Sequence, residues 1–301
     1  MEEFKYSWLS AYVFCALSIF FFHTIDWLKC DYGILHGYFA RGALCMTGFF
    51  ILSGFALTTS HYDKKFEHSK EYLVFYKKRI LSLFPSYWIL LTLYLLIFNT
   101  ESLKNVFLSL PIEYTGSHMF FENMFHFLCN GGTWFITCFI LCYFVFPLLL
   151  GIFRELTAKT KVRIFCVITL FLVYAPVYTH MMKIPSIYSN PTFRMMEFAL
   201  GVIIALMKKE GVVLKLTERQ KKMSIYFGFV LLVLVANAFG IIGIESFDNY
   251  SFYDCIAIPI FSIILFMGGV LLQRNFLFWH QREHMIFSWF HFLHFRLSLK
   301  L

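Results

Sequence analysis

The chain has 301 residues, of which 59% are hydrophobic and 15% are charged, and its formal net charge is +8. Soluble proteins average about a quarter charged residues, so this composition predicts a membrane protein and excludes an ordinary soluble enzyme. The basic residues occur in short clusters between apolar runs, which is the pattern that sets membrane topology rather than one that binds nucleic acid.

Nine apolar runs reach or approach the length that crosses about 30 Å of hydrocarbon. They cover residues 9–28, 42–60, 82–99, 133–150, 164–180, 194–207, 223–243, 254–272 and 286–301. The sixth run is short, and the ninth continues to the last residue. The expected fold is an all-α polytopic bundle of about nine transmembrane helices, embedded in the lipid bilayer as a single domain over residues 1–301.

The distribution of Lys and Arg predicts the orientation of this bundle. With a cytoplasmic N-terminus, the inside loops hold eighteen Lys and Arg residues and the outside segments hold five. Because cytoplasmic loops carry the excess of positive charge, we expect the N-terminus inside. The inside loops are then 61–81, 151–163, 208–222 and 273–285.

Ionisable residues gather near the outer ends of three predicted spans. His23 and Asp26 are three residues apart, so they share a helix face, and the carboxylate is placed to orient the imidazole. Arg41 enters the second span from outside, and Arg194 and Glu197 share a face of the sixth. Such groups are costly in lipid and usually face a cavity or a partner. A buried polar site and a set of structurally satisfied residues remain equal alternatives.

Two further features also have two explanations each. Lys77, Lys78 and Arg79 precede an apolar run opened by Pro85, either as the ordinary basic flank of a span or as a dock for a cytoplasmic anionic ligand. Gly48, Ser53 and Gly54 lie within a single apolar run, either for close helix packing or as a narrow wall beside a ligand channel. No spacing typical of metal ligands occurs.

Six blocks of the chain, in order, resemble the integral-membrane acyltransferase 3 family. The most specific match is "TGFFILSGFALT", which resembles the family's F-F-x-x-S-G-F segment. The others are "CALSIFFFH", "FYKKRILSLFPSYW", "TWFITCFILCYFVFPLL", "FRMMEFALGVIIA" and "FSWFHFLHF".

This resemblance implies transfer of an acyl group, commonly acetyl from cytoplasmic acetyl-coenzyme A, to a hydroxyl of a cell-envelope carbohydrate in the bacterial cytoplasmic membrane. His23 becomes the general base and Asp26 its helper. The donor-binding residues become Lys77, Lys78, Arg79, Ser53 and Gly54, and the acceptor side involves Arg41, Trp134, Arg194, Glu197 and His294. Independently of the resemblance, we expect no metal, because no metal-ligand spacing occurs, and no nucleic-acid partner, because membrane topology explains the basic residues.

The sequence also departs from the family pattern. Tyr12 and Ser82 stand where relatives usually have arginine, and Phe139 stands where many have glutamate. The chain stops seven residues after His294, where relatives finish a longer helix. Two alternatives therefore stay open: a carrier or flippase for an envelope precursor, and a truncated or degenerate family member without activity.

Overall fold

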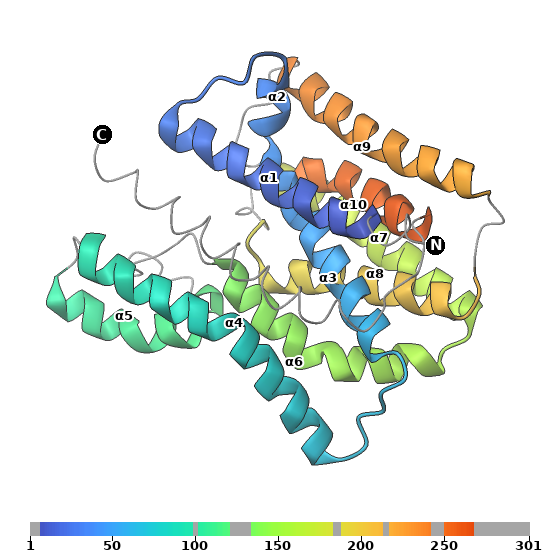
Figure 1. Ribbon diagram of the computed structural model, residues 1–301, viewed down its shortest axis with the longest axis horizontal. Coiled ribbons are helices and arrows are strands. Elements are labelled where there is room, and N and C mark those ends of the chain that lie inside the picture. The colour runs from blue at the N-terminus through green and yellow to red at the C-terminus, as the bar shows by residue number, and fades with distance from the viewer. Residues whose placement is uncertain are drawn as a thin grey trace. The chain divides into compact units, whose positions relative to one another are not determined.

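The computed structural model describes residues 7–98, 102–120, 134–182, 188–212, 217–241 and 250–267, and Figure 1 shows them as helices joined by connections. No strand occurs in these residues, which confirms for them the prediction of an all-α protein. The longer helices are α1 (Ser7–Leu28), α3 (Cys45–His61), α4 (Ser69–Phe98), α5 (Leu103–Thr115), α6 (Trp134–Glu155), α7 (Ala158–Met181), α8 (Pro191–Lys209), α9 (Glu218–Ile241) and α10 (Tyr250–Met267). The short ones are η2 (Gly33–Leu35), α2 (His36–Phe39), η3 (Gly42–Leu44) and η4 (His118–Phe120).

The first eight predicted spans coincide with these helices in whole or in part. Within the described residues, four helical stretches are long and apolar enough to cross a membrane: Gly42–His61, Ser69–Ile97, Trp134–Glu155 and Ala158–Thr179. Helices α1, α9 and α10 contain shorter apolar stretches. The ninth predicted span and His294 within it lie outside the described residues. The helices therefore support a membrane protein, while the number of nine spans and the orientation stay predictions.

Two helical segments differ from the sequence prediction. α4 begins at Ser69 instead of residue 82, so Pro85 lies inside the helix and not at its start. α5 occupies a stretch in which the sequence predicted only an outside loop. Both segments mix charged and apolar residues, and a search for continuous apolar runs therefore misses them although their residues are compatible with helix.

The described residues fall into two compact units. Unit 1 contains those of 1–64, 148–188 and 193–273, and unit 2 contains those of 65–147 and 189–192. Unit 1 thus holds α1, α3 and most of α8, and unit 2 holds α4, α5 and most of α6. A single membrane-embedded domain stays a prediction.

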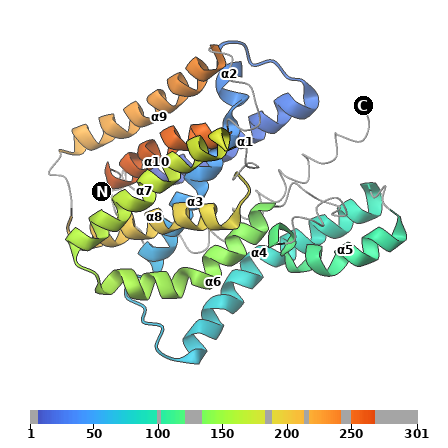
Figure 2. The same ribbon diagram turned by 180° about the vertical axis from the view of Figure 1, so that it is seen from behind.

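Close contact between α3 and α8 organises unit 1, and Figures 1 and 2 show the two helices crossing. A Cβ atom at Gly54 would collide with the carbonyl oxygen of Phe198, and one at Gly201 would collide with the backbone of α3. Gly48 leaves room in the same way for the ring of Phe261 in α10. These glycines let helices approach backbone to backbone, so packing accounts for their presence in an apolar run.

We expect Gly54→Ala to lower the free energy of unfolding by about 1–3 kcal/mol, because the added methyl group meets backbone atoms that cannot rotate away. Gly151→Ala in α6 is the matched control, since nothing lies within 4 Å of its added Cβ atom and alanine favours helix over glycine. Thermal unfolding of both variants in detergent measures the difference. Equal midpoints would contradict the tight α3–α8 contact.

Candidate functional site

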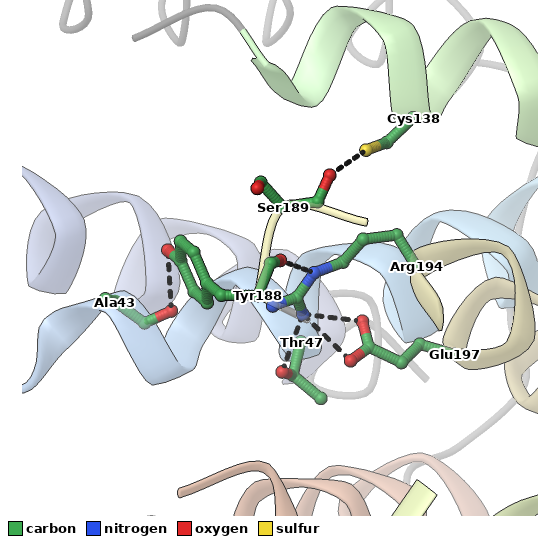
Figure 3. A network of polar contacts seen from close by, with 7 residues as sticks. All are labelled: Ala43, Thr47, Cys138, Tyr188, Ser189, Arg194 and Glu197. Carbon is green, nitrogen blue, oxygen red and sulfur yellow. Dashed lines mark hydrogen bonds and ion pairs between the residues drawn. The ribbon is translucent and has the colours of Figure 1, made fainter. Parts of the chain in front are cut away.

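A buried ion pair lies near the start of α8, in unit 1. The Arg194 Nη1 atom donates to both carboxylate oxygens of Glu197 at 2.8 Å, and to the Thr47 hydroxyl of α3 at 3.0 Å (Figure 3). Arg194 and Glu197 are each only 1% exposed. A charge buried to this degree is tolerated only when it is paired and hydrogen-bonded, and this pair meets both conditions. The prediction that the two residues share a helix face is confirmed.

The same guanidinium fixes the chain that leads into α8. Its Nε atom donates to the carbonyl oxygen of Tyr188 at 2.7 Å, and its Cζ atom lies 4.8 Å from the centre of the Tyr188 ring. The Tyr188 hydroxyl in turn donates to the carbonyl oxygen of Ala43 at 3.4 Å (Figure 3). Arg194 therefore ties the α8 entry segment to the start of α3. Figure 3 also draws a contact within unit 2, in which the Cys138 thiol donates to the Ser189 carbonyl oxygen at 3.6 Å.

Ser53 faces α1 in unit 1. Its hydroxyl lies 3.2 Å from the hydroxyl of Tyr12, and both side chains are buried. The neighbouring Gly54 contacts the backbone of α8, as described above. In unit 1 these two residues thus join α3 to the helices on either side, and their role in donor binding stays a prediction.

His23 lies toward the C-terminal end of α1. Its ring is half-buried, with its centroid 5.1 Å from that of Phe22. Asp26 lies in the last turn of the same helix, but its side chain is outside the described residues. The structure therefore supports the helical spacing of the two residues and leaves the predicted carboxylate–imidazole contact untested.

Arg41 is buried beside α1 in unit 1. Its Nη1 atom donates to the carbonyl oxygen of Gly37 at 2.8 Å. The next residue, Gly42, packs so closely on α1 that a Cβ atom there would collide with the carbonyl oxygen of Ser18. Arg41 is thus held next to the part of α1 that precedes His23 by one to two turns.

A buried tyrosine joins the connection after α1 to both neighbouring helices. The Tyr38 hydroxyl lies 2.5 Å from that of Ser18 and 3.7 Å from the sulfur of Cys45. Burial raises the pKa of Tyr38 well above its ordinary value, because the phenolate would lose its hydration. The phenol therefore stays neutral and serves as a hydrogen-bonding group.

The predicted basic cluster of α4 divides between two surroundings in unit 2. Lys77 and Lys78 are exposed, whereas Arg79 is only 4% exposed. The Arg79 guanidinium carbon lies 5.6 Å from the centre of the Phe75 ring and 5.8 Å from that of Tyr143 in α6. Among the described residues no carboxylate pairs with it. Arg79 is therefore a buried cation between aromatic rings.

Trp134 is the other predicted acceptor-side residue that lies within the described part of the chain. Trp134 is the half-buried first residue of α6, with its ring centroid 6.5 Å from that of Phe135. Within the part of the chain that the structure describes, no group of three or more His, Cys, Asp or Glu residues is arranged to hold a metal ion.

Residues 13–293 match the sequence pattern of the acyltransferase 3 family, described as an acyltransferase domain. The chain belongs to this family. The match covers nearly the whole chain, so the family resemblance of the six blocks is confirmed and an acyltransferase role follows from it. No curated protein sequence and no solved structure matches the chain.

The structure shows the surroundings of the three residues that depart from the acyltransferase 3 family pattern. Tyr12 reaches Ser53 with its hydroxyl, and Phe139 is buried with its ring centroid 5.8 Å from that of Tyr143. Ser82 is half-buried in α4. A hydroxyl–hydroxyl contact and an aromatic pair therefore occupy two positions at which relatives carry charge.

Sequence reasoning missed three residues that contact the candidate residues: Thr47 and Tyr188 beside Arg194 in unit 1, and Tyr143 beside Arg79 in unit 2. Thr47 and Gly54 are seven residues apart, so they share the face of α3 that meets α8. That spacing could have placed Thr47 at the helix interface that Gly54 indicates. Tyr188 lies in a connection and Tyr143 in a continuous apolar run, and neither has a local pattern that marks it.

We expect Glu197→Ala to lower the free energy of unfolding by about 3–5 kcal/mol, because it leaves the buried Arg194 charge without its carboxylate. Glu67→Ala is the matched control, since Glu67 pairs with Lys65 at 3.7 Å on the surface, where ion pairs contribute little. Thermal unfolding of the two variants checks this. A midpoint for Glu197→Ala as high as that for Glu67→Ala would show that the buried pair is not structural.

Proposed function

We propose that this acyltransferase 3 family member transfers an acyl group, acetyl in the simplest case, from cytoplasmic acyl-coenzyme A to a hydroxyl of a cell-surface polysaccharide or its precursor. The reaction takes place across or within the bacterial cytoplasmic membrane, in a bundle of nine spans with a cytoplasmic N-terminus. Family membership supports the acyl transfer, and the excess of Lys and Arg in the predicted inside loops supports the orientation.

The proposal that this chain binds acyl-coenzyme A rests on the burial of Arg79 without a described carboxylate partner. A guanidinium that is 4% exposed and pairs with no described carboxylate is costly, since a buried charge needs a counter-charge. An anionic ligand supplies one, and Arg matches the paired oxygens of a phosphate group well. We assign Arg79 to the diphosphate of acyl-coenzyme A, and the exposed Lys77 and Lys78 to attraction of its negative charge.

For Ser53, Gly54, Arg194 and Glu197 we propose positioning roles. Each is buried and directs its polar atoms or its backbone at a neighbouring helix or connection of unit 1. Ser53 and Gly54 fix the wall of the donor path, and Arg194 and Glu197 fix the wall of the acceptor side. Arg41, Trp134 and His294 are the candidates for direct acceptor contact.

His23 is the proposed general base. Its imidazole takes the proton of the acceptor hydroxyl while that oxygen forms a bond to the thioester carbonyl carbon. The carbon–sulfur bond then breaks, the ester remains on the acceptor, and coenzyme A leaves as a thiolate that takes up the proton. Imidazole suits this task because its pKa lies near working pH, and Asp26 is the candidate that orients it.

We expect His23→Ala to reduce acyl transfer by about 10²- to 10⁴-fold, the usual contribution of a general base, while the protein stays inserted in the membrane. O-acetyl groups on surface glycans, measured by mass spectrometry in a deletion strain that carries the variant, report the activity. His36→Ala is the control, because His36 is a partly exposed histidine beside Asp31 in the same unit. Full activity of His23→Ala would remove this imidazole from the mechanism and favour a carrier.

We expect Arg79→Ala to raise the KM for acetyl-coenzyme A by about 10- to 100-fold with a smaller change in kcat, since a hydrogen bond to a charged group contributes about 1.5–3 kcal/mol. Arg79→Lys should fall between the variant and the wild type because it keeps the charge and loses the planar fork. Release of the coenzyme A thiol by membranes measures both constants. Lys70→Ala, an exposed site in the first turn of α4, is the control. An unchanged KM in Arg79→Ala would show that the basic cluster is only the ordinary basic flank of a membrane span.

A further inference from the structure

Helix α5 is arranged inside out compared with a surface helix in water. It exposes Leu103 (75%), Phe107 (71%) and Leu108 (55%), while it buries Ser109 (1%) and Glu113 (0%). A helix at a water surface places its apolar face inward and its polar face outward. The reversed pattern is the one expected of a helix whose outer face meets an apolar solvent.

Contacts between α5 and α4 show how far α5 returns along its neighbour. The Tyr87 hydroxyl donates to the carbonyl oxygen of Glu113 at 2.6 Å, and the Trp88 indole donates to that of Tyr114 at 2.8 Å. The hydroxyls of Thr92 and Tyr114 lie 2.6 Å apart. Because α4 continues to residue 98, the last turn of α5 lies about 10–16 Å back from the end of α4.

The exposed side of α5 adjoins the exposed apolar face of α4. α4 is one of the helices apolar and long enough to span a membrane, yet only 28% of its most apolar stretch is buried. Its second half exposes Ile89 (60%), Leu96 (78%) and Ile97 (59%). The apolar residues of α5 therefore continue the face of a candidate transmembrane helix.

The end of α5 satisfies its backbone with protein groups. Gly116 adopts a left-handed conformation at φ 65°, its N–H donates to the carbonyl oxygen of Glu113 at 2.9 Å, and Ser117 N–H donates to that of Ile112 at 3.0 Å. The Gly116 carbonyl oxygen accepts from the hydroxyl of Thr137 in α6. A chain that turns inside a membrane requires this, because no water is present to replace the missing bonds.

We propose that α5 is a re-entrant helix whose Leu103, Phe107 and Leu108 side chains contact lipid acyl chains. It enters the membrane from the side on which α4 ends, runs back beside α4, and turns at Gly116 within the hydrocarbon. Its start lies at the headgroups, where Ser102 caps the helix by accepting from the Asn105 N–H and Lys104 is exposed. Its polar face carries Glu113 into the interior of unit 2. This inference does not depend on the proposed reaction.

Photo-crosslinking from single sites tests the proposal on the full-length protein. A benzophenone amino acid replaces Phe107 or Leu108, whose side chains are exposed, so the substitution removes no core packing. The variants are reconstituted in vesicles of phosphatidylethanolamine and phosphatidylglycerol and irradiated, and the products are identified by mass. Leu96 on the exposed face of α4 is the lipid-contacting control, and Lys65 in the connection before α4 is the water-exposed control.

We expect phospholipid adducts at positions 107 and 108 in yields close to that at position 96 and roughly tenfold above that at position 65. Adducts at position 96 without adducts at 107 and 108 would overturn the proposal. Crosslinks from 107 and 108 to another segment of the chain, to a second copy or to a partner protein would overturn it too, because each means that protein and not lipid covers this face.

Discussion

The backbone contact between α3 and α8 is the constraint on which unit 1 depends. Gly54 and Gly201 remove the side chains that would hold the two helices apart. Thr47 and Arg194 each precede one of these glycines by seven residues, or about two helical turns. The parallel crossing therefore carries the hydroxyl of Thr47 to the guanidinium of Arg194, and the ion pair with Glu197 forms at the same interface. A bulkier residue at either glycine would move Thr47 away from the ion pair that Arg194 and Glu197 form within α8.

The protein treats two buried arginines in different ways, and this difference suggests their roles. Arg194 has a carboxylate, a hydroxyl and a carbonyl oxygen as partners, so its charge is used within the fold. Arg79 has the rings of Phe75 and Tyr143 beside it and no described carboxylate. Aromatic rings attract a cation less strongly than a carboxylate does. This difference supports the proposal that Arg79 binds an anionic ligand and that Arg194 serves the fold.

Much of this architecture follows from the sequence, and the rest depends on contacts between distant segments. Continuous apolar runs located the helices, and the blocks around Ser53 and Arg194 identified the family. The sequence missed α5, because Lys104, Asn105 and Glu113 interrupt its apolar residues and leave no continuous apolar run. It also grouped Arg79 with Lys77 and Lys78. The structure separates Arg79 from the two lysines, because consecutive residues point to different faces of a helix. The choice between helix packing and a channel wall at Gly54 needed the position of α8.

The most direct test of the account is an experimental structure of the protein with acetyl-coenzyme A bound. The account predicts a diphosphate oxygen within about 3 Å of the Arg79 guanidinium, and the thioester beside a His23 imidazole that faces a water-filled cavity. A donor bound away from Arg79, or an imidazole turned toward the surrounding lipid, would contradict it.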